Sequence, residues 1–159
     1  MILRRLHKYI AAVAVASAAL LPTGCTPQPE AYSEYATLGK DGWAYDDTLV
    51  FVPQIPPAVE GRLSVGLRHN GDYPYRNLWL EVTTPIDSTH ARRDTLSVEL
   101  ADKFGRWKGT GIGALRQYEF PVARHVRVDS GARVLVRHIM RLDTLPDIEQ
   151  VGIFIEPAE

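Results

Sequence analysis

Apolar and polar residues alternate along most of the chain from about residue 48 onward. A period of two places successive side chains on opposite faces of an extended strand, so each alternating run predicts a strand with one face in a core. The runs cover residues 49–52, 62–68, 78–83, 96–100, 133–137 and 151–156. No segment after the N-terminal region shows a sustained period of 3.6, so the pattern predicts a protein built from strands.

Turn-forming residues separate these runs. Asn70-Gly71-Asp72 lies between two runs and predicts a hairpin, and Asp129-Ser130-Gly131 predicts another. Pro53 and Pro85 end runs, because proline cannot donate a hydrogen bond to a neighbouring strand. Seven or eight short strands with such turns predict an all-β fold, an antiparallel β-sandwich of immunoglobulin-like or jelly-roll type. The alternation does not choose between these two topologies.

The N-terminal residues follow a different pattern, which predicts an export signal. Residues 1–8 form a basic head, residues 9–21 are apolar apart from Ser17, and Pro22 ends the apolar stretch. This stretch is shorter than the ~20 apolar residues that a membrane-spanning helix needs, so it favours a cleaved secretory signal over a retained anchor.

Cys25 directly follows Thr23-Gly24 at the end of this signal. A small residue before a cysteine at this place resembles a bacterial lipobox, in which the signal is cut before the cysteine and the thiol is acylated. Pro22 occupies the third position before the cysteine, where a lipobox usually has leucine. The alternative is an ordinary secretory signal followed by an incidental cysteine. We expect residues 1–24 to be a lipoprotein signal peptide, residues 25–34 a lipidated, proline-containing tether, and residues 35–159 a single β-sandwich domain.

Composition and charge narrow the function classes. The chain has 18 basic and 19 acidic side chains, but Arg4, Arg5 and Lys8 belong to the signal. Residues 25–159 therefore carry 15 basic against 19 acidic side chains, a formal charge of −4. A mildly acidic domain excludes a polybasic nucleic-acid binder, and one cysteine excludes an internal disulfide framework.

Sequence motifs give no support for catalysis or metal binding. The four histidines beyond the signal are His69, His90, His125 and His138, and none has the spacing of a metal site. The chain lacks a Gly-x-Ser-x-Gly elbow. Gly109-x-Gly111-x-x-Ala114 approaches a dinucleotide fingerprint but lacks the strand and helix around it, so a flexible corner is the better interpretation. We expect no enzyme activity, no metal and no cofactor beyond the covalent lipid.

One aromatic-rich region predicts an interaction surface. The candidate residues are Tyr73, Tyr75, Asn77, Trp79 and Trp107. Trp79 is out of phase with the leucines on either side of it, which predicts that its ring faces outward. Exposed aromatic rings anchor protein interfaces and also provide flat faces for sugars. The alternative, that these rings fill an edge of the sandwich, stays open.

Three blocks of sequence carry a family resemblance. They are Tyr-Pro-Tyr-Arg-Asn-Leu-Trp-Leu at 73–80, Asp-Lys-Phe-Gly-Arg-Trp-Lys-Gly-Thr-Gly at 102–111, and Leu-Pro-Asp-Ile at 145–148. Together with Cys25, they resemble the gliding-motility lipoprotein H family (GldH) of Bacteroidetes-type bacteria, over about residues 35–155. The first block is the most specific. Asp147 stands where the family pattern leads us to expect glycine.

The resemblance implies a non-enzymatic lipoprotein of the cell envelope, in the outer membrane, associated with gliding machinery and the linked type IX secretion apparatus. It assigns no catalytic residues. The expected partners are the membrane, through the lipid, and other envelope proteins. The alternative is a lipid-anchored carbohydrate-binding module that stacks a glycan on Trp79, Tyr75 and Trp107. Which face of the membrane the domain occupies stays open.

Overall fold

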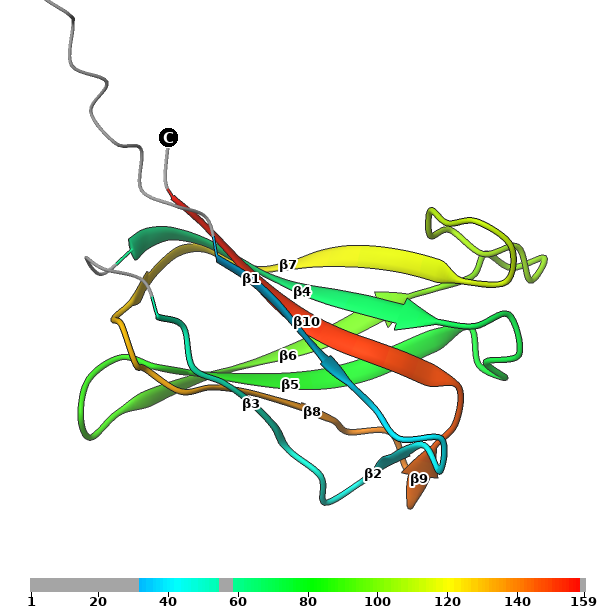
Figure 1. Ribbon diagram of the computed structural model, residues 1–159, viewed down its shortest axis with the longest axis horizontal. Coiled ribbons are helices and arrows are strands. Elements are labelled where there is room, and N and C mark those ends of the chain that lie inside the picture. Colours follow the sequence, from blue (N-terminus) through cyan, green and yellow to red (C-terminus); the bar gives the residue numbers. More distant parts are fainter. Residues whose placement is uncertain (1–31, 55–58, 158–159) are drawn as a thin grey trace, which may run out of the picture.

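The computed structural model describes residues 32–54 and 59–157, which form two packed antiparallel sheets (Figure 1). The first sheet has the strand order β1–β10–β4–β7, the second has the order β3–β8–β5–β6, and β2 and β9 form a separate two-stranded ribbon. The bounds are β1 Tyr32–Thr37, β2 Trp43–Ala44, β3 Leu49–Phe51, β4 Val59–His69, β5 Asn77–Pro85, β6 Ala91–Glu99, β7 Arg116–Val128, β8 Val134–His138, β9 Thr144–Leu145 and β10 Ile148–Pro157. The predicted all-β sandwich is confirmed.

The strand order identifies the sandwich as a jelly roll. When the strands of the two large sheets are counted one to eight along the chain, the sheets read 1-8-3-6 and 2-7-4-5. Consecutive strands therefore lie in different sheets at every step except β5 to β6. This crossing pattern is that of two interlocked Greek keys. It excludes the immunoglobulin-like alternative, in which several consecutive strands share a sheet.

Both hairpins predicted from turn residues are wrong, although the turns themselves exist. The Asn70 side chain accepts a hydrogen bond from the Asp72 backbone N–H at 2.8 Å, which makes a tight turn. However, the connection 70–76 carries the chain from β4 in the first sheet to β5 in the second, and 129–133 carries it from β7 to β8. A turn signal marks where a strand ends, but it does not determine which strand pairs next.

The hairpin that does form joins β5 and β6 through residues 86–90, which contain no glycine. The Asp87 carboxylate accepts hydrogen bonds from the backbone N–H groups of Thr89 and His90, at 2.7 and 2.8 Å. These bonds, the one from Thr89 foremost, lower the pKa of Asp87 to about 2. An aspartate turn therefore closes this hairpin in place of the expected Asn-Gly type.

The sequence prediction missed the short ribbon strands β2 and β9 and two strands of the large sheets, β7 and β1. Strand β7 contains Pro121, which argues against a strand, and its register against β4 shifts twice near Leu63, which breaks the alternation. Because β7 lies at the edge of its sheet, it tolerates proline. Strand β1 is also an edge strand and buries few side chains, so it has no clear alternation to detect.

The predicted alternation has the correct phase in the central strands. Apolar side chains from β4, β5, β8 and β10 meet between the sheets, with exposures of 4% or less. They are Leu63, Val65, Leu67, Leu78, Leu80, Val82, Val134, Val136, Val151, Ile153 and Ile155. Removing so much apolar surface from water is the main force that holds the two sheets together.

Strand pairing defines the two ends of the sandwich. Tyr32 pairs with Ile155, which pairs with Leu63, whereas Thr37 pairs with Gln150, which pairs with Arg68. We call the level of Tyr32 the tether end, because the described chain begins there. The opposite end holds the connections 70–76 and 100–115, which lead into β5 and β7, and we call it the finger end (Figure 1).

Paired glycines make room for aromatic rings on the outer face of the first sheet. Gly152 and Gly66 lie opposite each other on β10 and β4, with Tyr35 of β1 opposite Gly152. The Tyr35 ring contacts Phe154 edge-on, with the ring centroids 5.5 Å apart, and the Arg68 guanidinium lies 4.0 Å above it. The aromatic ring takes the space that side chains at the two glycines would fill.

We expect Gly152→Ala to destabilise the fold by about 2 kcal/mol, the usual cost of overpacking. An added Cβ would lie 2.6 Å from the Glu34 backbone oxygen and 2.8 Å from the Tyr35 ring, and the backbone oxygen cannot move aside cheaply. Urea unfolding of the mature chain measures this cost. Gly39→Ala is the control, since nothing lies within 4 Å of its added Cβ. Equal stability of both variants would contradict this packing.

Asp147 occupies a backbone conformation that favours glycine. Its φ is 61°, and among non-glycine residues of the described chain it alone has a positive φ. The Asn70 amide donates a hydrogen bond to the Asp147 carboxylate at 3.2 Å, and the Asn70 backbone N–H donates to the Asp147 carbonyl at 3.3 Å. The glycine expected here from the family pattern therefore has a structural reason, and aspartate is among the residues that tolerate this conformation.

The domain begins earlier than the expected boundary at residue 35. Strand β1 starts at Tyr32 and pairs with β10 from that residue onward, so part of the expected 25–34 tether belongs to the first sheet. Residues 1–31, with the predicted signal and Cys25, lie outside the described residues. Within the described part of the chain, no helix is long and apolar enough to cross a membrane.

Candidate functional site

Aromatic side chains gather around His69 at the finger end. His69 is fully buried at the end of β4, and the rings of Trp107, Tyr73 and Tyr118 lie 4.5, 5.3 and 5.4 Å from it between centroids. Tyr73 comes from the connection 70–76, Trp107 from 100–115 and Tyr118 from β7. This cluster therefore fastens both long connections of the finger end to the core.

Hydrogen bonds complete the cluster. The Tyr118 hydroxyl donates to the Leu100 carbonyl at 2.9 Å and lies 3.2 Å from His69 Nε2. His69 Nδ1 contacts the Asn70 carbonyl, which assigns the single N–H of a neutral imidazole to that nitrogen. Burial lowers the pKa of His69 and outweighs the opposing effect of the Asn70 hydrogen bond. The imidazole is therefore a neutral structural group in the core.

We expect the fold to lose stability as the pH falls below about 6.5. Burial also lowers the pKa of His138. Both histidines therefore bind protons more readily in the unfolded chain, where the pKa of a histidine is about 6.5, than in the folded chain. Their contribution to stability is complete above pH 6.5 and declines at lower pH, by up to about 1.4 kcal/mol per pH unit for each histidine. Urea midpoints at pH 7.5, 6.5 and 5.5 measure the slope. His69→Gln should reduce it, and a slope unchanged in that variant would contradict the assignment.

The structure does not bring the five predicted surface residues onto one surface. Tyr73 is 3% exposed and donates a hydrogen bond from its hydroxyl to the Asn77 carbonyl at 3.1 Å, so it belongs to the core. Tyr75, Asn77 and Trp107 are half-buried. Trp79 is 42% exposed, facing outward as predicted, but it lies on the outer face of the second sheet.

The outer face of the second sheet offers little support for a sugar platform. Next to Trp79 on this face of β5, Glu81 accepts a hydrogen bond from Arg137 Nε at 2.9 Å. Glu81 and Arg137 border a hollow of about 310 Å³ that Trp79 does not line. The half-buried rings of Tyr75 and Trp107 do not join Trp79, because Trp107 packs against His69 and Tyr75 packs edge-on against Tyr73. The three rings therefore do not provide the paired exposed faces that the carbohydrate alternative requires.

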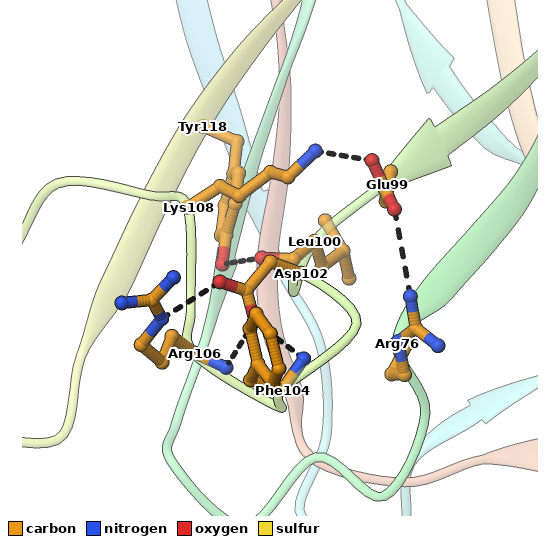
Figure 2. Close-up of polar contacts among 8 residues, drawn as sticks. All are labelled: Arg76, Glu99, Leu100, Asp102, Phe104, Arg106, Lys108 and Tyr118. Atoms are coloured by element: carbon orange, nitrogen blue, oxygen red, sulfur yellow. Dashed lines mark hydrogen bonds and ion pairs between the residues drawn. The ribbon is translucent and has the colours of Figure 1, made fainter.

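The first loop of connection 100–115 carries an exposed apolar side chain, Phe104. Residues 101–107, which we call finger 1, are closed by a bridge between Ala101 and Trp107. At the tip, the Asp102 carboxylate accepts hydrogen bonds from the backbone N–H groups of Phe104 and Arg106, at 2.8 and 3.0 Å, and from Arg106 Nε at 2.7 Å (Figure 2). These contacts lower the pKa of Asp102, and the hydrogen bond from the Arg106 backbone N–H has the largest effect. Phe104 is 71% exposed on this loop.

Ion pairs hold the base of finger 1 against β6. Glu99 at the end of β6 pairs with Lys108 and also with Arg76 Nη2 at 3.6 Å, so it joins the connection 70–76 to finger 1 (Figure 2). These contacts lower the pKa of Glu99, and the hydrogen bond from Lys108 has the largest effect. These pairs are exposed and add little stability, but together they orient the loop.

Residues 110–117 form a second projection, which we call finger 2. Thr110 and Gln117 close it with two backbone hydrogen bonds of 3.0 and 2.7 Å. Ile112 lies between Gly111 and Gly113 and is 93% exposed, and Leu115 is 37% exposed. Arg116 Nη1 donates to the carbonyls of Gly113 and Leu115, at 2.7 and 2.9 Å. The corner expected here is a loop closed by backbone hydrogen bonds, with an apolar tip.

Sequence reasoning missed the apolar tips of both fingers. The aromatic residues at 73–79 form the larger group in the sequence, whereas Phe104 and Ile112 are isolated in polar or glycine-rich surroundings. That isolation was the available signal. An apolar residue flanked by glycines, or by lysine and glycine, has no alternating neighbours with which to join a core.

Among described residues no group of histidine, cysteine and acidic side chains could hold a metal.

Comparison with known proteins adds the family to this geometry. The family description "GldH lipoprotein" matches residues 30–155, which is most of the chain. The chain belongs to the GldH lipoprotein family. The match begins before β1, ends within β10 and includes both fingers.

Two relatives and one solved structure illustrate these similarities. The chain is 26% identical over 150 residues to the gliding motility lipoprotein GldH of Flavobacterium johnsoniae, covering 89% of this chain and 93% of the relative. It is 25% identical over 138 residues to a GldH homolog of Christiangramia forsetii, covering 80% and 84%. A TNF structure from S. frugiperda, Eiger, is similar with a TM-score of 0.37 and 8% identity, covering 83% of this chain and 96% of that one.

Proposed function

We propose that this protein is a lipid-anchored, non-enzymatic component of the gliding-motility machinery and of the type IX secretion apparatus linked to it. The observation that carries the proposal is the family match over 30–155, together with two relatives described as gliding motility lipoproteins. The mechanism is attachment and presentation: a lipid sets the location, and a rigid sandwich holds binding loops in place.

Acylated Cys25 supplies the attachment. The lipobox-like sequence Leu-Pro-Thr-Gly-Cys and the family description as a lipoprotein support this assignment. Several acyl chains together bind a bilayer stably, because each buried methylene adds about 0.8 kcal/mol. The outer membrane is the proposed location.

A short tether sets the reach of the domain. Seven peptide units separate Cys25 from Tyr32, so the tether end of the sandwich lies within about 24 Å of the lipid. The finger end lies on the far side, because β4 runs six residues from the level of Tyr32 to His69, about 20 Å. The fingers therefore point away from the anchoring membrane when the domain stands upright.

The electrostatics of the described residues fit a binding role. The shifted carboxyl pKa values belong to groups that hold turns and loops, namely Asp87, Asp102 and Glu99. The histidines with lowered pKa values, His69 and His138, are buried as structural groups. These groups shape and fix the loops, which is what a recognition module needs.

Deletion of the gene in the source bacterium tests the proposal. We expect the deletion to reduce surface spreading, or secretion of type IX substrates where the strain does not glide, and the wild-type gene to restore it. The readouts are colony expansion and the protein content of the culture supernatant. Unchanged spreading and unchanged secretion in the deletion strain would overturn the proposed function.

A further inference from the structure

We infer that the two fingers are a docking surface for a protein partner that offers an apolar pocket with an acidic rim. This inference rests on the proposed function and names the chemistry of the partner. It uses residues outside the aromatic group singled out by sequence, since the carrying side chains are Phe104, Ile112 and the basic residues around them.

Exposure of the two apolar tips is the first observation. Phe104 and Ile112 are 71% and 93% exposed, although each belongs to a residue type that folding normally buries. Both lie at the finger end, on consecutive loops between β6 and β7. Phenylalanine is enriched in protein interfaces, and both tips present apolar surface at the same end of the sandwich.

The hydrogen bonds that close finger 1 are the second observation. The Asp102 carboxylate fixes the backbone on both sides of the Phe104 tip through the N–H groups of Phe104 and Arg106 (Figure 2). The loop is also closed by hydrogen bonds between the Asp102 N–H and the Arg106 carbonyl, and between the Gly105 N–H and the Asp102 carbonyl, at 2.9 and 3.0 Å. A preformed loop loses little conformational entropy on binding, which favours its use as an anchor.

Charge is the third observation. Residues 100–116 contain four basic side chains against one acidic side chain, a formal +3, whereas residues 25–159 as a whole carry −4. Lys103 lies with its Nζ 5.0 Å from the Phe104 ring centroid, and the Arg106 guanidinium lies 5.4 Å from it. Two cations therefore lie beside the Phe104 ring, and although Asp102 offsets the charge of Arg106, the net positive charge of residues 100–116 is complementary to an acidic rim and steers its approach.

Position favours a protein over the anchoring bilayer. Basic loops with apolar tips also bind anionic membranes. The tether, however, reaches at most about 24 Å, and the finger end lies about 20 Å beyond the level of Tyr32 before the length of the fingers is added. Bringing the fingers to the same membrane would require the upright domain to lie on its side or to fold back over an almost fully extended tether. A protein on the far side meets no such restriction.

Site-specific photocrosslinking in cells that express the full lipoprotein tests the inference. Benzoyl-phenylalanine is placed at position 104, 112 or 86. Ile86 is the matched control, because it is also exposed, at 67%, but lies in the hairpin at the tether end. We expect positions 104 and 112 to yield adducts with the same protein, whose crosslinked peptide contains acidic residues, and position 86 to yield none with that protein.

Charge reversal provides the second arm. Lys103→Glu should lower the adduct yield at position 112 about tenfold, since like charge would face the acidic rim. Arg124→Glu, on the exposed surface of β7, is the control and should leave the yield unchanged. Equal adducts from positions 86 and 104, no protein adduct from either finger, or no response to Lys103→Glu would overturn the inference.

A vesicle arm separates protein from lipid. The mature chain, with Cys25 replaced so that no lipid is attached, is floated with phosphatidylethanolamine vesicles containing about a third phosphatidylglycerol. Flotation that is lost in Phe104→Ser would identify a membrane surface as the occupant and overturn the inference.

If the Phe104→Ser/Ile112→Ser chain restores spreading and secretion in the deletion strain, the inference fails while the proposed function stands. A deletion strain with unchanged spreading and unchanged secretion would instead contradict the proposed function.

Discussion

Trp43→Ala is expected to destabilise the fold by about 3–5 kcal/mol, a large part of the 5–15 kcal/mol that stabilises an ordinary domain. Trp43 is fully buried, and its ring packs edge-on against His138 with the centroids 5.2 Å apart. Its indole Nε1 donates to the Asp47 carbonyl at 3.0 Å, and its own carbonyl lies 3.0 Å from His138 Nε2. Alanine would leave a cavity and remove one hydrogen-bond donor together with the ring contact.

Trp79→Ala provides the matched control for Trp43→Ala. Trp79 is 42% exposed on the outer face of the second sheet, so its loss should cost less than about 1 kcal/mol. Urea unfolding midpoints of the two variants, compared with the parent chain, measure the difference. Similar midpoints for the two variants would contradict the placement of Trp43 in the core and Trp79 on the surface.

Alternation predicted the central strands well, because their fully buried apolar side chains recur at every second position and meet the other sheet. In β5, Leu78, Leu80 and Val82 are fully buried while Trp79 is exposed, which is the phase that the sequence indicates. The edge strand β7 shows why the method fails elsewhere: Pro121 and two register shifts interrupt its period. Edge strands satisfy fewer backbone partners and bury fewer side chains, so their sequences are less constrained.

Topology could not be derived from turn residues. Asn70-Gly71-Asp72 forms a tight turn, but the buried Tyr73 directly after it draws the chain towards the core and the second sheet. The choice between hairpin and crossing depends on long-range packing, which a local motif does not contain. The same limit applies to the candidate surface. Tyr73 and Trp107 converge on His69 from distant segments, and the exposed tips of Phe104 and Ile112 appear only once the loops are placed.

Replacement of Cys25 by alanine is expected to abolish lipid attachment altogether. The thiol is the acylation site in the proposed processing, and residues 25–159 offer no second cysteine. Metabolic labelling with an alkyne fatty acid measures the effect: the parent protein should carry the label and the Cys25→Ala protein should carry none. A chain in which residues 26–159 follow an ordinary secretory signal should move from the membrane to the soluble fraction. Label retained by Cys25→Ala would exclude this cysteine as the attachment site.

The most direct test of the central claim, an envelope lipoprotein anchored through Cys25, is the mass of the N-terminal peptide isolated from cell membranes. The account predicts a peptide that begins at Cys25, with residues 1–24 removed and a mass increased by thioether-linked diacylglycerol and an amide-linked acyl chain. A mature peptide that begins elsewhere, or one that contains an unmodified Cys25, would contradict it.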